Sequence, residues 1–270
     1  MEVLTYPESW LELAETGQPK PYLKTFNFPG AYINDRHAAF VAAPGGRMGL
    51  QTCIDLGVDG YLLHTDALKL YELAYCAQGN ILELGTYKGL SASIIAKGIS
   101  DSGRRNCSLT TCEINRSFVR IAKRNLSRMD ECRISRVGVG PLARGLITGF
   151  RNIIGRETIA AASCKRVDVH FRVGDATELM DVLIANGMKY GFIFVDHWHG
   201  YDATYQAAIR IAPLLEDGGF VMFHDFNDGV SKLPDHVHKV YQAVGDTIVK
   251  DPQFRFCMIV GGAAIFQKSK

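Results

Sequence analysis

Acidic side chains occur at five points where an apolar run ends or turns, and two of these points also carry histidine. A buried carboxylate without a partner is costly, so acids in this recurrent position indicate that a polar ligand is bound there. The imidazole of histidine has an unperturbed pKa of about 6.5 and can exchange a proton at physiological pH. The residues concerned are Glu83, Glu113, Asp175, Asp196 with His199, and His224 with Asp225.

The first acid begins a glycine-containing turn, ELGTYKG, at residues 83–89. The two glycines allow the backbone to approach a ligand closely, and a helix that starts near Leu90 would offer free N–H groups. A dinucleotide-binding turn normally reads G-x-G-x-x-G, whereas the glycines here are spaced G-x-x-x-G. The carboxylate of Glu83 would repel a pyrophosphate, but it suits a ligand that carries an ammonium and a sulfonium group.

Strand and helix patterns alternate around these acids. The predicted strands are mainly apolar and are read as non-alternating, which is typical of a parallel sheet covered on both faces. We therefore expect an α/β, doubly wound, Rossmann-like sheet of seven strands, mostly parallel, that closes with an antiparallel hairpin. In such a sheet the ligand lies across the carboxyl ends of the strands. The predicted strands are 80–85, 108–114, 167–175, 190–196 and 218–225, the helices are 90–99, 117–126, 176–187, 201–215 and 236–244, and the hairpin is 254–269.

Two segments lie outside this alternation. Residues 1–60 are rich in Pro, Gly and aromatics, and we expect them to form a cap on the substrate side of a main domain at 61–270. A helix should start soon after residue 61, capped by Thr65 or Asp66. Residues 133–166 form a basic insertion with seven Lys or Arg and one acid. It could be a surface or dimer-contact helix, a lid over the site, or a contact for an anionic partner.

Composition narrows the class of protein. The formal charge of +2 does not predict nucleic-acid binding, and the longest apolar run is far shorter than the roughly 20 residues that span a membrane. The first residues lack the pattern of a secretory signal. Seven cysteines without paired metal spacing favour reduced thiols. We expect a soluble cytoplasmic protein, and the apolar, Arg-rich insertion makes a homodimer unsurprising.

Several motifs together resemble one enzyme family. ELGTYKGLSA followed by TTCEINRSFVRIA resembles the S-adenosylmethionine site of the catechol and caffeoyl-CoA O-methyltransferases. FIFVDHWHGY resembles the Asp-His-Trp-Lys segment of the catechol enzyme, and APLLEDGGFVMFHD is similar to the helix end, Gly turn and strand that follow it. Bacterial small-molecule and sugar O-methyltransferases have a similar pattern. The resemblance covers about residues 60–266 outside the insertion, and it implies a class I methyltransferase.

The resemblance implies S-adenosyl-L-methionine as the cofactor. Its methionine part would lie at the glycine turn, its ribose at Glu113, and its adenine against Ile114 and the edge formed by Asp175 and Ala176. His197 would stack or cap near the adenine. The implied cofactor residues are Glu83, Gly85, Thr86, Tyr87, Gly89, Ser91, Glu113, Ile114, Asp175, Ala176, Asp196, His197 and Trp198.

The resemblance also implies a divalent metal, magnesium in the first instance, with Asp196 and Asp225 as ligands near the methyl group. The family places an asparagine directly after the second Asp as third ligand, but this chain has Phe226 there. An oxygen ligand would suit magnesium, whereas a histidine would favour a transition metal. The candidates for the third ligand are Asn227, which we expect, Asp228 and His224.

The catechol enzyme uses a lysine as general base at the position of His199. A phenolic acceptor has a pKa of about 10 and must lose its proton to attack well, which a metal and a nearby base promote. His199, with Asp196 beside the methyl group, is therefore the catalytic candidate. The expected function is O-methylation of a small molecule such as a phenol, catechol, sugar or secondary metabolite. The alternatives are a metal-dependent redox enzyme on the same fold and a regulatory binder of S-adenosylmethionine.

Overall fold

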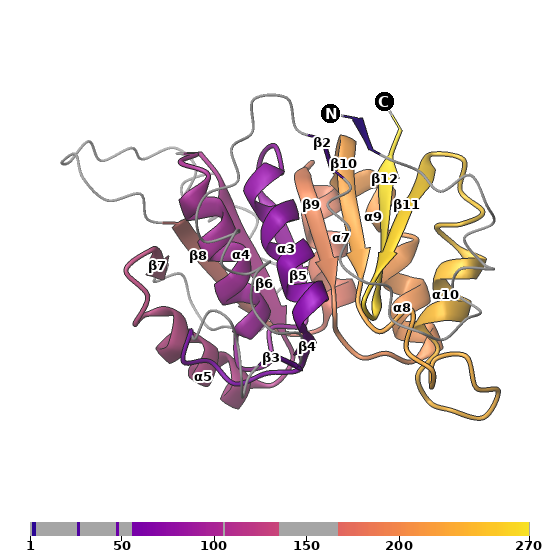
Figure 1. Ribbon diagram of the computed structural model, residues 1–270, viewed down its shortest axis with the longest axis horizontal. Helices are drawn as coiled ribbons and strands as arrows, with labels where there is room; N and C mark the ends of the chain where they lie inside the picture. The colour runs from indigo at the N-terminus through magenta and orange to yellow at the C-terminus, as the bar shows by residue number, and fades with distance from the viewer. Residues whose placement is uncertain are drawn as a thin grey trace.

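The computed structural model describes residues 2–3, 26–27, 47–48, 56–104, 106–134 and 167–269. Its centre is an eight-stranded sheet with the strand order β11-β12-β10-β9-β5-β6-β8-β7 (Figure 1). The strands are β5 (Ile81–Leu84), β6 (Ser108–Glu113), β7 (Cys132–Ile134), β8 (Val167–Val173), β9 (Tyr190–Val195), β10 (Leu215–Phe223), β11 (Phe254–Val260) and β12 (Ala263–Lys268). Two small antiparallel pairs join β1 (Glu2–Val3) to β2 (Phe26–Asn27), and β3 (Arg47–Met48) to β4 (Leu62–Leu63).

The sheet is mixed, as the sequence predicts. Six neighbouring strands pair in parallel, in the order β10, β9, β5, β6, β8 and β7. Strand β12 pairs antiparallel with both β10 and β11. The carboxyl ends of β5, β6, β8, β9 and β10 therefore meet along one edge, because parallel strands point the same way. This edge is where the acidic residues of the motifs are brought together.

Helices cover both faces of the sheet. Successive residues of a strand point to opposite faces, so Ile81 of β5 belongs to one apolar core and Leu82 to the other. The first core is shared with α3 (His64–Cys76), α4 (Leu90–Asp101) and α5 (Arg116–Leu126). The second core is shared with α7 (Ala176–Ala185), α8 (Tyr201–Ala208), α9 (Ile211–Leu214) and α10 (Val240–Asp246).

The predicted number of seven strands was wrong by one, because β7 was missed. This strand is only three residues long and lies at the edge of the sheet. Its middle residue, Arg133, is exposed and forms an ion pair with Asp168 of β8. A short edge strand with a charged centre carries too little apolar pattern to be read from the sequence.

Helix boundaries also differ from the prediction, most clearly in three helices. The helix predicted at 201–215 is divided into α8 and α9, since Pro213 has no N–H to donate to the carbonyl of Ile209. Helix α10 begins at Val240 rather than at residue 236. Helix α3 begins at His64, and within the described residues its start has no side-chain cap, so Asp66 lies inside the first turn.

Most of the predicted cap at 1–60 and nearly all of the basic insertion at 133–166 lie outside the described residues. Within the part of the chain that the structure describes, no helix is long and apolar enough to cross a membrane. The five cysteines in that part, Cys76, Cys107, Cys112, Cys132 and Cys257, are free thiols.

Candidate active site

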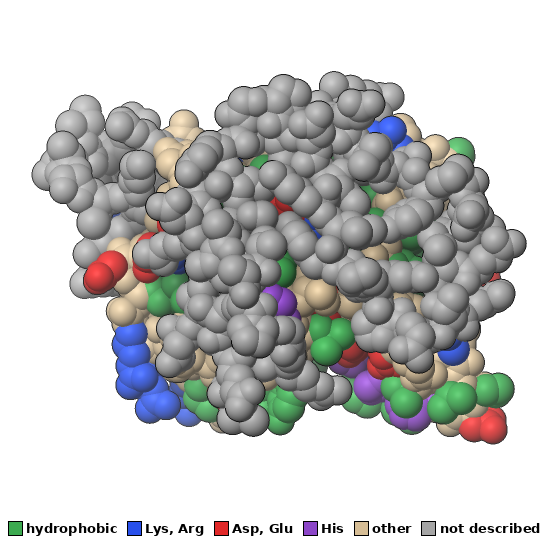
Figure 2. All heavy atoms as spheres, in the orientation of Figure 1, with side chains coloured by type: hydrophobic (Ala, Val, Ile, Leu, Met, Phe, Trp, Pro, Cys, Tyr) green, Lys and Arg blue, Asp and Glu red, His purple; other side chains and the backbone are tan. Residues whose placement is uncertain are grey.

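A cavity of about 620 Å³ opens at the carboxyl ends of the parallel strands. In the view of Figure 2, histidine and acidic side chains gather at the lower right of the molecule, beside exposed apolar side chains. Most of the site residues predicted from the sequence line this cavity. They are Gly85, Thr86, Tyr87, Ser91, Glu113, Ile114, Asp175, Ala176, Asp196, His197, Trp198, His199 and Asp225.

The turn after β5 depends on glycine. Gly85 has a φ of 99°, and a Cβ there would lie 2.0 Å from the carbonyl oxygen of Asp196. Gly89 has a φ of 93° and caps the start of α4, where a Cβ would meet Leu126 at 2.8 Å. The turn is also tied to the next strand, since the N–H of Tyr87 donates to Glu113 Oε2 at 2.9 Å. Two neighbouring strand ends thus form one continuous wall of the cavity.

The end of β8 leads directly into the N-terminal cap of helix α7. Asp175 Oδ1 accepts hydrogen bonds from the N–H groups of Thr177 and Glu178, at 2.8 and 3.2 Å, and so caps α7. Beside it, Ile114 and Trp198 line the cavity although 71% and 65% of their surfaces are exposed. Exposed apolar side chains that lie together in a cavity are found in ligand-binding grooves.

Glu83 lies beneath the cavity and is fully buried. Burial raises the pKa of its carboxyl to about 7, although hydrogen bonds from Ser91 and Thr111 act in the opposite direction. Thr111 also contacts Thr86, which lines the cavity. Glu83 is therefore linked to the cavity through hydroxyl groups. Neither Glu83 nor Gly89, which caps α4, is among the described residues that line the cavity.

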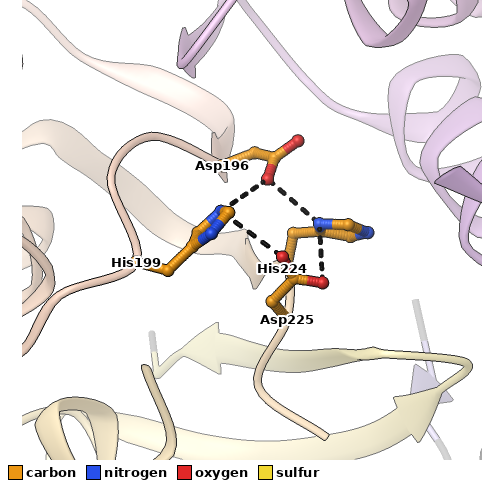
Figure 3. A group of neighbouring side chains, drawn as sticks. All are labelled: Asp196, His199, His224 and Asp225. Carbon is orange, nitrogen blue, oxygen red and sulfur yellow. Dashed lines mark hydrogen bonds and ion pairs between the residues drawn. The ribbon is translucent and has the colours of Figure 1, made fainter. Parts of the chain in front are cut away.

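Four side chains converge at the far end of the cavity (Figure 3). His199 Nε2 lies 3.3 Å from Asp196 Oδ1 and 3.4 Å from Asp225 Oδ2. His224 Nδ1 lies 3.0 Å from Asp196 Oδ1 and 3.3 Å from Asp225 Oδ1. One oxygen or nitrogen from each of the four residues lies within 4.8 Å of the others, an arrangement that could hold a metal ion.

The charges in this cluster reinforce one another. Burial would raise the pKa of Asp196, but the positive charges and hydrogen bonds of His224 and His199 lower it to about 2. Burial would lower the pKa of His199, but the carboxylates of Asp196 and Asp225 raise it above its ordinary value. The pKa of His224 is raised well above its ordinary value for the same reason, again against burial. Both imidazoles consequently hold a proton more tightly than a free histidine does.

Asp225 has an unusual backbone. Its φ of 53° is in the left-handed region, which residues other than glycine visit uncommonly. The conformation places its carboxylate between the two imidazoles, where the charge of His224 lowers its pKa despite burial. Strained backbone of this kind occurs preferentially at functional sites.

The predicted third metal ligand, Asn227, is buried and is not among the residues that line the cavity. Its Oδ1 accepts a hydrogen bond from Lys232 Nζ at 3.2 Å, and its Nδ2 donates to the carbonyl of Gly261 at 3.3 Å. Asp228 belongs, with Asp225 and His238, to a second group of side chains that could hold a metal ion. The ring of His238 lies edge-on to His199, with 4.9 Å between the ring centres.

Sequence reasoning missed one member of the cluster. Asp66 was expected as a helix cap, but its Oδ2 lies 3.4 Å from His224 Nε2. The available signal was an acid, Asp66, at the start of a mainly apolar helix pattern, DALKLYELA. The aromatic wall was missed as well, in which Phe118 lies edge-on to Tyr87 at 4.6 Å.

Comparison with known proteins decides the family. A family model described as a methyltransferase domain matches residues 82–226, which is more than half of the chain. The chain belongs to this methyltransferase family. The resemblance noted in the strand-end motifs is thereby confirmed, and the matched range of the methyltransferase domain runs from β5 to the loop after β10, where the cavity lies.

Solved structures share the fold of this methyltransferase. The O-methyltransferase of tomaymycin synthesis from Streptomyces achromogenes, in complex with SAM, is 19% identical over 75% of this chain and 78% of its own, with a TM-score of 0.50. A SAH-bound methyltransferase from Podospora anserina is 15% identical, covers 100% of both chains, and also has a TM-score of 0.50. No curated protein sequence matches the chain.

Proposed function

We propose that this methyltransferase transfers the methyl group of S-adenosyl-L-methionine to a hydroxyl group of a small acceptor, such as a phenol, catechol, sugar or secondary metabolite. The observation that carries the proposal is that Asp196 belongs to two parts of the site. It lines the cavity beside the glycine turn, and its carboxylate contacts both His199 and His224. The cofactor pocket and the cluster suited to proton transfer are therefore one continuous site.

The cavity supplies recognition for each part of the cofactor. The carboxylate of Glu113 accepts hydrogen bonds from the N–H groups of Tyr87 and Asn115. These use two of its roughly four acceptor positions. The remaining positions would accept the two ribose hydroxyls. The exposed side chains of Ile114 and Trp198 offer apolar surface for the adenine. Glu83, buried below the turn, would act on the methionine part through the hydroxyl groups of Thr111 and Thr86.

The side chains of the cluster are of the kinds that bind a divalent metal. Asp196 and Asp225 offer oxygen, and we assign the third position to His224 because its Nδ1 already lies against both carboxylates. Asn227 is a poorer candidate, since its amide is engaged by Lys232 and Gly261. When bound, a divalent cation would lower the pKa of the acceptor hydroxyl. The imidazole favours a transition-metal ion over magnesium, while the two carboxylates also suit Mn²⁺.

His199 is the proposed general base. Its ring is partly exposed, with 23% of the side chain accessible, so it can reach a bound acceptor. Asp196 and Asp225 orient the ring through Nε2 and raise its pKa, which makes the neutral imidazole a stronger base. Methyl transfer from a sulfonium is an in-line displacement, so the remaining residues mainly hold donor and acceptor aligned.

A calorimetric titration with S-adenosylhomocysteine, the demethylated product, tests the cofactor assignment. We expect one-to-one binding with a dissociation constant on the order of micromolar or below. Glu113→Ala should weaken binding at least tenfold, about 1.4 kcal/mol, whereas the exposed acid variant Glu216→Gln should bind like the wild type. Absence of heat at high ligand concentration would remove S-adenosylmethionine from the proposal. Transfer of a labelled methyl group to phenolic and sugar acceptors then tests the reaction.

A further inference from the structure

A buried carboxylate lies behind the ring of His224. Asp66, in the first turn of α3, has no exposed surface, and its Oδ2 is 3.4 Å from His224 Nε2. The opposite ring nitrogen, Nδ1, is the one that faces Asp196 and Asp225 in Figure 3. The imidazole therefore bridges one carboxylate behind it and two carboxylates in the cavity.

The position of Asp66 is itself fixed by the backbone. Both of its carboxylate oxygens accept from the N–H of Gly262, at 3.1 and 3.3 Å, in the turn between β11 and β12. A Cβ on the neighbouring Gly261 would lie 2.1 Å from Asp66 Oδ1, and Gly261 has a φ of 53°. The turn thus needs a glycine where the carboxylate approaches it. Helix α3 and the closing hairpin hold Asp66 from two sides.

We propose that Asp66 is a positioning residue that holds the Nε2–H of His224 and so directs the Nδ1 lone pair into the cavity as a metal ligand. This inference rests on the metal site of the proposed function. A histidine ligand commonly donates its second N–H to a carboxylate, which fixes the tautomer and the ring orientation. Removal of such a partner typically lowers metal affinity 10- to 100-fold.

A purely structural ion pair between Asp66 and His224 would behave differently. It would contribute to folding, and its loss would leave the metal affinity of the folded protein unchanged. A double-mutant cycle separates the two roles, because coupled residues give non-additive effects. If Asp66 acts through His224, its substitution has no further effect on metal affinity once His224 is replaced.

The experiment is a titration with Mn²⁺, followed by electron paramagnetic resonance of the free ion. We expect Asp66→Asn to weaken Mn²⁺ binding about 10- to 100-fold while the affinity for S-adenosylhomocysteine stays the same. Glu72→Gln is the matched control, since Glu72 is equally buried in α3 and pairs with Lys69, away from the cluster. It should bind Mn²⁺ like the wild type. In a His224→Gln background, Asp66→Asn should add no further loss.

The outcomes separate this inference from the proposed function. Tight Mn²⁺ binding by the wild type and unchanged binding by Asp66→Asn overturns the role of Asp66 alone. Absence of Mn²⁺ binding by the wild type removes the metal site, and the inference with it, while leaving cofactor binding intact. Nitrogen NMR of the wild type loaded with Zn²⁺ gives a test that needs no variant. It should show His224 protonated at Nε2, and a metal bound at that nitrogen overturns the proposal.

Discussion

The imidazole of His199 is the side chain whose loss should affect chemistry most and binding least. Its ring contacts Asp196, Asp225 and His238, whereas the glycine turn and Glu113 line the proposed cofactor region. We expect His199→Ala to lower kcat about 10²- to 10⁴-fold, the usual contribution of a general base. The dissociation constant of S-adenosylhomocysteine should change less than about threefold, because this variant leaves the cofactor pocket in place.

Steady-state kinetics and calorimetry on the same protein preparation check this prediction. His170→Gln serves as the control, since His170 lies on β8 and is not among the described residues that line the cavity. Wild-type turnover in His199→Ala would assign the proton transfer to another group. A joint loss of turnover and cofactor binding would indicate a structural role for the ring.

The buried carboxyl of Glu83 predicts a pH dependence of stability. Its pKa rises from an ordinary 4.5 to about 7 on folding, chiefly through burial. A raised pKa favours the protonated form in the folded state, so this stabilisation is complete below pH 4.5 and is lost as the pH rises through 7. The free energy of unfolding of the ligand-free protein should therefore fall between pH 5 and pH 8, by up to about 3 kcal/mol from this group.

Urea denaturation at a series of pH values measures this loss. Glu83→Gln keeps the shape of the side chain without its titration, so its curve should be flatter than that of the wild type over the same range. Thr110→Val, a change at a neighbouring buried position of β6, should leave the slope unaltered. Parallel curves for wild type and Glu83→Gln would show that Glu83 does not titrate in this range.

At this scale the sequence predicted which acids meet at the edge of the sheet wherever the acid lies at the end of its own strand. Glu113, Asp175, Asp196 and Asp225 could be placed together because parallel strands end at one edge. Asp66 could not, since its contact with Gly262 joins residues 196 positions apart and depends on how a helix packs against a hairpin. Whether His224 or Asn227 faces the cavity depends on the strained backbone of Asp225, which no sequence pattern encodes.

Among the elements, the turn between β5 and α4 is the one most sensitive to substitution. Gly85→Ala would combine a left-handed φ with a Cβ placed 2.0 Å from the carbonyl oxygen of Asp196. We expect it to destabilise the protein by roughly 2–4 kcal/mol and to weaken S-adenosylhomocysteine binding at least tenfold. The cause is that the turn must move away from β9, which widens the cavity.

Gly187→Ala is a matched comparison. Gly187 also has a positive φ, 64°, but among the described residues no atom lies within 4 Å of the added Cβ. This variant should cost only about 1–2 kcal/mol of backbone strain and should bind the ligand normally. Urea denaturation and calorimetry of both variants compare the two effects. Equal behaviour of the two would mean that contact with Asp196 does not limit the turn.

The order of strands and helices was predictable because each long element carries its own apolar pattern. Strands β5 and β9 are buried at every position, which the mainly apolar stretches at 80–85 and 190–196 had indicated. The pattern failed for short elements. The strand β7 and the helix α9 have three and four residues, and pairing with β8 or the proline at 213 decides their limits.

For the whole molecule, ligand binding should appear as added stability. The cavity takes residues from five strand ends, so a ligand that fills it bridges both halves of the parallel sheet. S-adenosylhomocysteine at 100 times its dissociation constant should add about 2.7 kcal/mol to the free energy of unfolding. For a chain of this size that corresponds to a rise in Tm of roughly 5–10 °C.

Differential scanning calorimetry at several ligand concentrations checks this shift. Adenosine alone should give a smaller rise, because it lacks the methionine part that the turn would bind. A Tm that does not depend on ligand concentration would contradict binding to the folded protein. The same series with added Mn²⁺ shows whether cofactor and metal stabilise the protein independently.

The hydrogen bonds between Asp66 and Gly262 have a consequence for how the protein is made. Asp66 leaves the ribosome long before the hairpin of β11 and β12, whose turn supplies the N–H that holds its carboxylate. Until those last residues are synthesised, Asp66 lacks the backbone partner that fixes it behind His224. A nascent chain can therefore complete much of the parallel sheet and still have an unfinished active site, which closes only when the final hairpin docks against α3.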